Sequence, residues 1–230
     1  MLTEGVLTII QARMSSTRLP GKVLLPLGGR PVLEHVLDRA RKTRLCGRVV
    51  VATTTSRSDD AVVGFCEKSG AEYFRGSELD VLDRFYQCAR LHASNIILRL
   101  TADNPLVDTE LLDKTVQLHF EYNADYVAFE GAPVGAIGET LSWRALEESW
   151  VEANDQQDRE HVITFVRRHP DRFRVHLVPC PDSDWMVPDL RLTLDTIEDY
   201  ARLQRLFETS GAGQPSVREL LRATSRNLLK

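Results

Sequence analysis

The sequence predicts an α/β fold in which a mainly parallel sheet is covered by helices on both faces. Over the first 130 residues, short apolar runs alternate with amphipathic helical stretches. The chain has 230 residues, of which 43% are hydrophobic, and this is enough for one large domain. The alternation breaks after about residue 130 and returns after about residue 185. We therefore expect a single domain over residues 1–230 with an inserted subregion at about 131–185.

Each expected element follows from its local pattern. An apolar run predicts the first strand, and the first helix has proline at its start, one apolar face and basic residues in its last turn. Gly28-Gly29 marks a tight turn between them. Thr196 and Asp199 resemble a capping box at the start of a late helix. The expected strands are Val6–Gln11, Val49–Thr53, Glu72–Arg75, Ile96–Leu100, Asp125–Ala128, Arg174–Val178 and Leu190–Leu194. The expected helices are Pro31–Thr43, Asp59–Ser69, Asp80–Ala93, Thr109–Tyr122, Trp143–Glu152, Arg159–Arg168, Ile197–Thr209 and Val217–Ala223.

Composition excludes several classes of protein. The net charge of −4 gives no overall basic field, so we expect no nucleic-acid partner. The apolar runs are too short to cross a membrane, and Glu4 stands where a signal peptide would be basic. The four cysteines are widely spaced and form no Cys-x-x-Cys pair, which favours reduced thiols. We expect a cytoplasmic protein without a membrane partner.

A cationic loop follows the first strand. It reads Gln11-Ala12-Arg13-Met14-Ser15-Ser16-Thr17-Arg18-Leu19-Pro20-Gly21-Lys22. Arg13, Arg18 and Lys22 supply fixed positive charge, and the hydroxyls of Ser15 and Ser16 add hydrogen bonds suited to phosphate oxygens. The alternative is a solvated basic loop, which is the more common role of such residues. The loop alone does not decide between the two.

Two expected strands end in an aspartate on the side where ligands bind to open α/β sheets. Asp103 follows Ile96–Leu100, and Asp195 follows Leu190–Leu194. Carboxylates that face a phosphate-binding loop suit Mg²⁺, which commonly uses one or two of them together with substrate phosphates. Asp103 could instead cap the turn before Pro105, and Asp195 could favour a helix N-terminus. The joint occurrence beside one cationic loop favours a metal site.

Two further segments are candidates for contact with a second substrate. Arg159-Glu160-His161-Val162 lies in an expected helix, where Glu160 and His161 would point in different directions and form no metal pair. Its alternative is a solvated polar helix face. Glu139 lies in a glycine-rich irregular segment, where it could be solvated or could bind sugar hydroxyls.

Several familiar motifs are missing from the sequence. No Gly-x-Gly-x-x-Gly follows the first strand, and Gly21-Lys22 is followed by Val23 in place of the Ser or Thr of a P-loop. There is no Gly-x-Ser-x-Gly elbow and no Asp-x-Asp after the middle strand. Dinucleotide binding, P-loop chemistry and serine hydrolysis are therefore disfavoured.

The chain resembles the SpsF-like cytidylyltransferase family of the spore-coat polysaccharide biosynthesis type, which is related to the CMP-Kdo and CMP-sialic acid synthetases. The order and spacing of the matching segments extend over nearly the whole chain. These segments are Ile9–Lys22, Arg99–Asp108, Arg159–Val162 and Leu190–Thr196.

The resemblance implies a GT-A-like Rossmann-type three-layer sandwich and Mg²⁺-dependent transfer of CMP from CTP to a sugar acid or related polysaccharide precursor, with release of pyrophosphate. It also implies a homodimer. The implied catalytic residues are Arg13, Lys22, Asp103 and Asp195, of which Asp103 and Asp195 hold the metal. The implied nucleotide-binding residues are Gln11, Ala12, Arg13, Ser15, Ser16, Arg18, Lys22, Thr53, Thr54, Arg99 and Asp103. The implied acceptor-binding residues are Glu139, Arg159, Glu160, His161 and Arg191.

Two other functions fit the same fold. A glycosyltransferase that uses a nucleotide sugar is disfavoured by the missing Asp-x-Asp and by the dense positive charge of the first loop. A non-catalytic nucleotide-binding protein is disfavoured by the presence of both Asp103 and Asp195.

Overall fold

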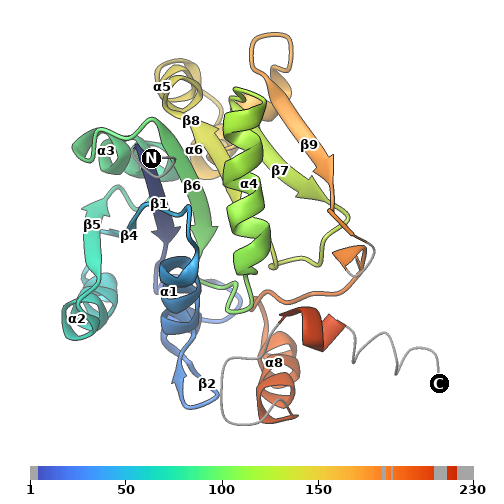
Figure 1. The fold of residues 1–230 in the computed structure, drawn as a ribbon. Coiled ribbons are helices and arrows are strands. Elements are labelled where there is room, and N and C mark those ends of the chain that lie inside the picture. The colour runs from blue at the N-terminus through green and yellow to red at the C-terminus, as the bar shows by residue number, and fades with distance from the viewer. Residues whose placement is uncertain (1–4, 183–184, 188, 210–216, 222–230) are drawn as a thin grey trace.

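A seven-stranded sheet forms the middle layer of the molecule, with strand order β5-β4-β1-β6-β8-β7-β9 (Figure 1). The computed structural model describes residues 5–182, 185–187, 189–209 and 217–221. The strands of the sheet are β1 (Val6–Gln11), β4 (Arg48–Thr54), β5 (Glu72–Gly76), β6 (Ile96–Thr101), β7 (Tyr126–Glu130), β8 (Glu139–Ser142) and β9 (Val175–Pro179). The helices are α1 (Val32–Lys42), α2 (Asp60–Ser69), α3 (Val81–Leu91), α4 (Thr109–Glu121), α5 (Trp143–Glu152), α6 (Gln156–Glu160), α7 (Thr164–Arg168) and α8 (Ile197–Thr209).

Alternate residues of the central strands pack against different helices. Leu7 and Ile9 of β1 lie in a buried cluster with α3, α5 and α7. Val6 and Ile10 of the same strand lie in a second cluster with α1, α2 and α4. Because side chains alternate between the faces of a strand, these two clusters are the two interfaces of a three-layer α/β/α sandwich. The expected fold class is confirmed.

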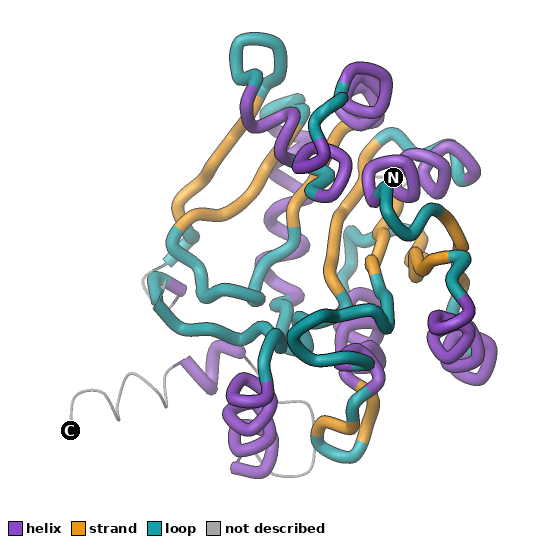
Figure 2. Tube along the Cα trace, turned by 180° about the vertical axis from the view of Figure 1, so that it is seen from behind, coloured by secondary structure: helices purple, strands orange, loops and turns teal. Residues whose placement is uncertain are grey.

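The order in which the chain adds strands to the sheet reverses at β1. The chain adds β4 and then β5 on one side of β1, and returns through α3 to add β6 on the other side, with all four strands parallel. Gln11 at the end of β1 pairs with Thr101 at the end of β6. Ligands bind at such a switch point, outside the carboxyl ends of the strands. Figure 2 shows connecting loops gathered at the edge of the sheet that faces α8.

Several local predictions are confirmed. Gly28 and Gly29 form the turn of a small hairpin between β2 (Pro26–Leu27) and β3 (Arg30–Pro31), with φ angles of +54° and +80° that favour glycine. At the start of α8, Thr196 N–H donates to Asp199 Oδ2 at 3.0 Å and Asp199 N–H donates to Thr196 Oγ1 at 3.3 Å. These reciprocal bonds form a capping box with aspartate in the acidic position.

Three expected elements differ from the structure. Glu139–Ser142, expected to be irregular, is the strand β8, which is antiparallel to both β6 and β7. Leu190–Leu194, expected to be a strand, forms only one bridge, between Arg191 and Val134. Leu192 and Leu194 fill the core beside α8, and their backbone N–H groups donate to two separate loops, at the carbonyls of Val134 and Asp103.

The expected helix Arg159–Arg168 is divided into α6 and α7. His161 ends α6 in an extended conformation with φ −112° and ψ 91°. The break lets Val162 pack in the core beside α3 and α5 while Glu160 and His161 both reach the central cavity. The expectation that these two side chains point in different directions is therefore wrong.

Among the described residues, 217–221 are helical, and the remainder of the helix expected at Val217–Ala223 lies outside them. Within the same described part of the chain, none of the helices combines the length and the apolar character needed to cross a bilayer.

Candidate active site

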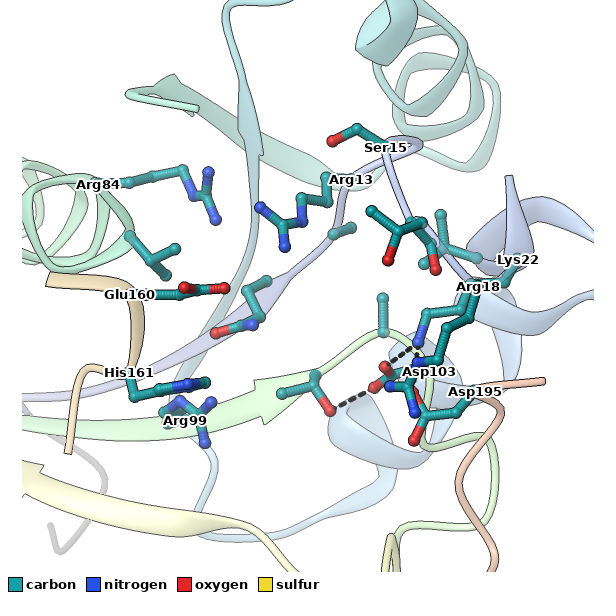
Figure 3. Close-up of a pocket in the computed structure, with 18 residues that line it drawn as sticks. Arg13, Ser15, Arg18, Lys22, Arg84, Arg99, Asp103, Glu160, His161 and Asp195 are labelled. Atoms are coloured by element: carbon teal, nitrogen blue, oxygen red, sulfur yellow. Dashed lines mark hydrogen bonds and ion pairs between the residues drawn. The ribbon is translucent and has the colours of Figure 1, made fainter. Parts of the chain in front are cut away.

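A cavity of about 400 Å³ opens at the carboxyl ends of β1 and β6 (Figure 3). Five separate parts of the chain form it: the loop after β1, the start of α3, the end of β6 with its turn, and the segments around residues 160 and 195. It brings together most of the residues that the sequence predicted for the site. Of those, the lining residues are Gln11, Ala12, Arg13, Ser15, Ser16, Arg18, Lys22, Arg99, Asp103, Glu160, His161 and Asp195.

The loop after β1 is held by its own backbone and by Asp59. Gly21 N–H donates to the carbonyl of Met14 at 2.9 Å, and Met14 N–H donates to Asp59 Oδ1 at 2.7 Å. The hydroxyl of Thr54 donates to the second oxygen of the same carboxylate. Thr53 and Thr54 are fully buried and do not line the cavity. Thr54 therefore positions the cationic loop through Asp59.

The ammonium of Lys22 joins the two aspartates that were predicted from separate strand ends. Its Nζ lies 2.5 Å from Asp103 Oδ2 and 2.9 Å from Asp195 Oδ1. The backbone supports this approach, because Leu194 N–H donates to the carbonyl of Asp103 at 2.8 Å. Thr101 Oγ1 donates to the other oxygen of Asp103 at 2.6 Å. Two carboxylates thus converge on one cationic group at the floor of the cavity.

Arginines complete the surroundings of Asp195. Arg18 Nη2 lies 2.8 Å from Asp195 Oδ1, and its side chain is 61% exposed. Arg191 Nη2 lies 3.2 Å from Asp195 Oδ2, outside the cavity lining. Arg191 was predicted to bind the acceptor, and the structure places it at the rim, paired with Asp195.

The wall of the cavity near β8 holds a buried ion pair. Arg99 Nη1 lies 2.6 Å from Glu139 Oε2, and Tyr126 Oη donates to Glu139 Oε1 at 2.8 Å. Burial, with the neighbouring Glu139 carboxylate, raises the pKa of Tyr126. A smaller cavity of about 160 Å³ shares Arg99 and Thr101 with the main one and includes Glu139. Glu139 therefore lies beside the main cavity, behind Arg99.

Arg159 does not line the cavity. Its guanidinium donates to Asp80 Oδ2 at 2.8 Å and to the carbonyl of Trp150 at 2.7 Å. Asp80 is also the N-cap of α3. Arg159 therefore ties α5 and α6 to the start of α3 and positions Glu160 and His161 next to it.

Arg84 of α3 lines the cavity and was not predicted from the sequence. The signal was present, because Val81, Arg84, Phe85 and Cys88 have the spacing of one helix face, and the other three are apolar. A charged residue on the buried face of an amphipathic helix indicates a special environment.

The fold and this cavity have the features of a nucleotidyltransferase, with a cationic loop at a topological switch point facing two carboxylates. A family model described as Cytidylyltransferase matches residues 7–220. The chain belongs to the cytidylyltransferase family, as the resemblance implied, and it is an enzyme of the nucleotidyl-transfer class that uses CTP.

Known relatives agree with this assignment. The spore coat polysaccharide biosynthesis protein SpsF of Bacillus subtilis (strain 168) is 40% identical over 230 residues, covering 97% of this chain and 95% of its own length. The structure of a cytidylyltransferase from Leptospira borgpetersenii superposes with a TM-score of 0.87 at 31% identity, covering 97% of this chain and 94% of that one. A CMP:2-keto-3-deoxy-manno-octonic acid synthetase complexed with CTP shares the fold, with a TM-score of 0.66 at 17% identity and coverage of 89% and 98%.

Proposed function

We propose that this protein transfers CMP from CTP to a sugar acid or a related polysaccharide precursor, releases pyrophosphate and requires Mg²⁺. The observation that carries the proposal is the convergence of Asp103 and Asp195 on the ammonium of Lys22, beside the cationic loop. The carboxylates come from distant parts of the chain, and no fold requirement brings two like charges together at a cavity.

The donor set fits a magnesium ion. No group of three or more acidic, histidine or cysteine side chains suited to a metal occurs in the described part of the chain. Asp103 and Asp195 would be its protein ligands, which agrees with the preference of Mg²⁺ for one or two carboxylates completed by phosphate and water. When bound, the ion would polarise the α-phosphate of CTP.

The chain's own cations act on the triphosphate. Arg13 and Arg18 both line the cavity and offer forked donors to the phosphate oxygens of the nucleotide. Lys22 can exchange the carboxylates for phosphate oxygens once another cation neutralises Asp103 and Asp195. Positioning and charge stabilisation are the main demands of phosphoryl-type transfer, and these residues meet them.

The acceptor is proposed to bind on the side of Arg99 and His161. Glu160 and His161 reach the cavity from the C-terminal end of α6, and Arg99 is held from behind by Glu139. Guanidinium, imidazole and carboxylate groups together can bind the carboxylate and hydroxyls of a sugar acid. The polysaccharide role in the name of the SpsF relative supports a sugar-type acceptor. We propose further that the subregion at about 131–185 contributes to acceptor binding and to a homodimer.

The test is an assay of pyrophosphate release. The protein is incubated with MgCl₂, each of the four nucleoside triphosphates and a panel of sugar acids. Release is expected with CTP and one class of acid, and is expected to stop in EDTA. No pyrophosphate with any triphosphate, together with transfer of sugar from a nucleotide sugar, would show a glycosyltransferase instead.

A further inference from the structure

The cationic side chains that line the cavity fall into two groups. Lys22 and Arg18 are bound to aspartates, and Arg99 is bound to a glutamate. Arg13 and Arg84 have no carboxylate partner among the residues that the structure describes. Figure 3 shows their guanidinium groups side by side, at the end of the cavity away from the aspartates. The cavity therefore has one end where the cations are held in direct ion pairs and one end where Arg13 and Arg84 are not, with the Glu160 carboxylate near the second end (Figure 3).

Arg84 is unusual because it is buried as well as unpaired. The residue is 1% exposed, and its Nη1 donates a hydrogen bond to the carbonyl of Ser77 at 2.7 Å. Its Nε is buried without a partner. The stem of the side chain passes directly over Gly76, where an added Cβ would lie 2.8 Å from Arg84 Cγ. The backbone thus leaves room for this arginine.

The environment of Arg84 lowers its pKa but leaves the guanidinium charged. Burial, and next the nearby charge of Arg13, lower the pKa of Arg84 to about 10. The guanidinium therefore stays protonated at neutral pH. The carboxylates of Asp59, Asp80 and Glu78 act in the opposite direction, but none of them forms a direct ion pair with Arg84 in the described part of the chain. A buried cation without a directly bound counter-charge is costly to the fold, and a second cation beside it adds repulsion. An anion between the two groups would remove both penalties.

We propose that Arg84 and Arg13 form a two-guanidinium subsite that binds the pyrophosphate portion of the nucleotide. The proposal rests on the proposed function and adds to it a residue of α3 that no sequence motif indicated. A diphosphate matches the site because it carries several negative oxygens that accept forked guanidinium donors. Cytidine has no charge to neutralise two cations, and a sugar acid carries only one carboxylate.

The experiment measures binding of inorganic pyrophosphate by titration calorimetry in EDTA. Arg84→Met removes the charge and keeps most of the stem, and Arg90→Met makes the same change at an exposed position of the same helix. Arg84→Met is expected to weaken pyrophosphate binding about tenfold or more, the loss typical of a charge-assisted hydrogen bond. Arg90→Met is expected to change it less than about twofold. Parallel titrations with cytidine and with a sugar acid should be the same for wild type and Arg84→Met.

Thermal unfolding of the ligand-free protein separates binding from a purely structural role. Because Arg84→Met replaces a buried unpaired charge by an apolar group, its Tm in EDTA is expected to equal or exceed that of wild type. Unchanged pyrophosphate affinity, or an equal loss for cytidine or for the sugar acid, would overturn the proposal.

Arg84→Lys keeps the charge without the forked donors and should bind pyrophosphate with intermediate affinity. Should Arg84→Met not fold, wild-type affinity in Arg84→Lys would likewise reject the subsite. The titrations need neither metal nor turnover, so the proposed function can fail while pyrophosphate binding through Arg84 stands, and the reverse.

Discussion

Acidic residues and arginines cluster at both ends of the strands of the sheet. The two clusters differ in how many of their charged groups form ion pairs within the protein. At the amino end of β7, Asp125 is 1% exposed and accepts hydrogen bonds from Ser142 Oγ, Arg144, and the backbone and side chain of Arg174. At the carboxyl ends of β1 and β6, Asp103 and Asp195 both pair with Lys22. Arg13 and Arg84 lie in the same cavity and form no ion pair with a described carboxylate.

The pKa of Asp125 shows what complete pairing achieves. Burial alone would raise its pKa, but the Arg174 backbone N–H and the side chains of Arg144 and Ser142 outweigh burial and lower the pKa to about 2. Both oxygens of this carboxylate accept hydrogen bonds from the protein itself. Full pairing thus indicates a cluster that stabilises the fold, and incomplete pairing at a cavity indicates one that binds.

The largest expected effect is on catalysis. Asp103→Asn and Asp195→Asn should each lower the rate of pyrophosphate release by a factor of about 10³ or more, because the metal loses half of its protein ligands. Thermal unfolding should change by no more than a few degrees, since Lys22 keeps one carboxylate in each variant. Near-wild-type rates in both variants would remove the metal assignment.

At the amino end of β7, substitution of Asp125 should lower stability and leave turnover nearly unchanged. Asp125→Asn is expected to lower the free energy of unfolding by about 2–3 kcal/mol, because it leaves Arg144 and Arg174 without their buried carboxylate. Turnover per folded molecule should stay within about twofold of wild type. Urea unfolding at pH 7 gives the first quantity and the pyrophosphate assay gives the second. A large loss of turnover with unchanged stability would contradict the contrast.

His119, a neighbour of Asp125, should make the stability of the fold depend on pH. Burial lowers the pKa of His119 to about 4, and its Nδ1 lies 3.0 Å from Thr140 Oγ1. In the unfolded chain His119 is protonated below about pH 6.5, whereas in the folded chain it stays neutral down to about pH 4. The free energy of unfolding therefore falls as the pH drops through this window. From pH 7 to pH 5 the loss should be about 2 kcal/mol.

Urea midpoints at the two pH values measure that loss, and His119→Gln, which does not titrate, should reduce it. The Asp125 contribution is distinct, because a carboxylate with a lowered pKa loses its stabilising effect only below about pH 4. An equal pH dependence in His119→Gln would show that another group is responsible.

The smallest effect is expected at the rim of the cavity. Arg191 pairs with Asp195 at 3.2 Å, and its side chain is 48% exposed. Exposed ion pairs contribute up to about 1 kcal/mol, so Arg191→Ala should change stability by less than that. Turnover should fall less than about tenfold. A loss as large as that of Asp195→Asn would instead place Arg191 in contact with substrate.

The sequence was sufficient for the features that depend on local pattern. The apolar run of β1, the polar turn at Asp103 and the capping box at Thr196 are each encoded within a few neighbouring residues, and the structure has all three. The convergence of Asp103 and Asp195 was predicted from two strand ends, but Leu190–Leu194 is not a strand of the sheet. Asp195 lies near Asp103 because Leu194 N–H donates to the carbonyl of Asp103.

What could not be predicted depends on distant contacts. Glu139–Ser142 is short and lacks a continuous apolar run, and it becomes a strand because β6 and β7 pair with both of its edges. The break at His161 arises because Val162 packs in the core against other helices. The unpaired state of Arg84 can be seen only when the partners of every cavity residue are known.

The antiparallel direction of β8 brings a different part of the chain to the cavity from the one that the parallel strands bring. Because β8 runs against its neighbours, its first residue, Glu139, and the segment that precedes it lie toward the cavity, whereas the parallel strands present their last residues there. Under the proposed function, exchange of the 131–138 segment would alter the wall behind Arg99 and leave the loop after β1 untouched. An acceptor site built on this segment would then vary independently of the residues proposed to bind the nucleotide.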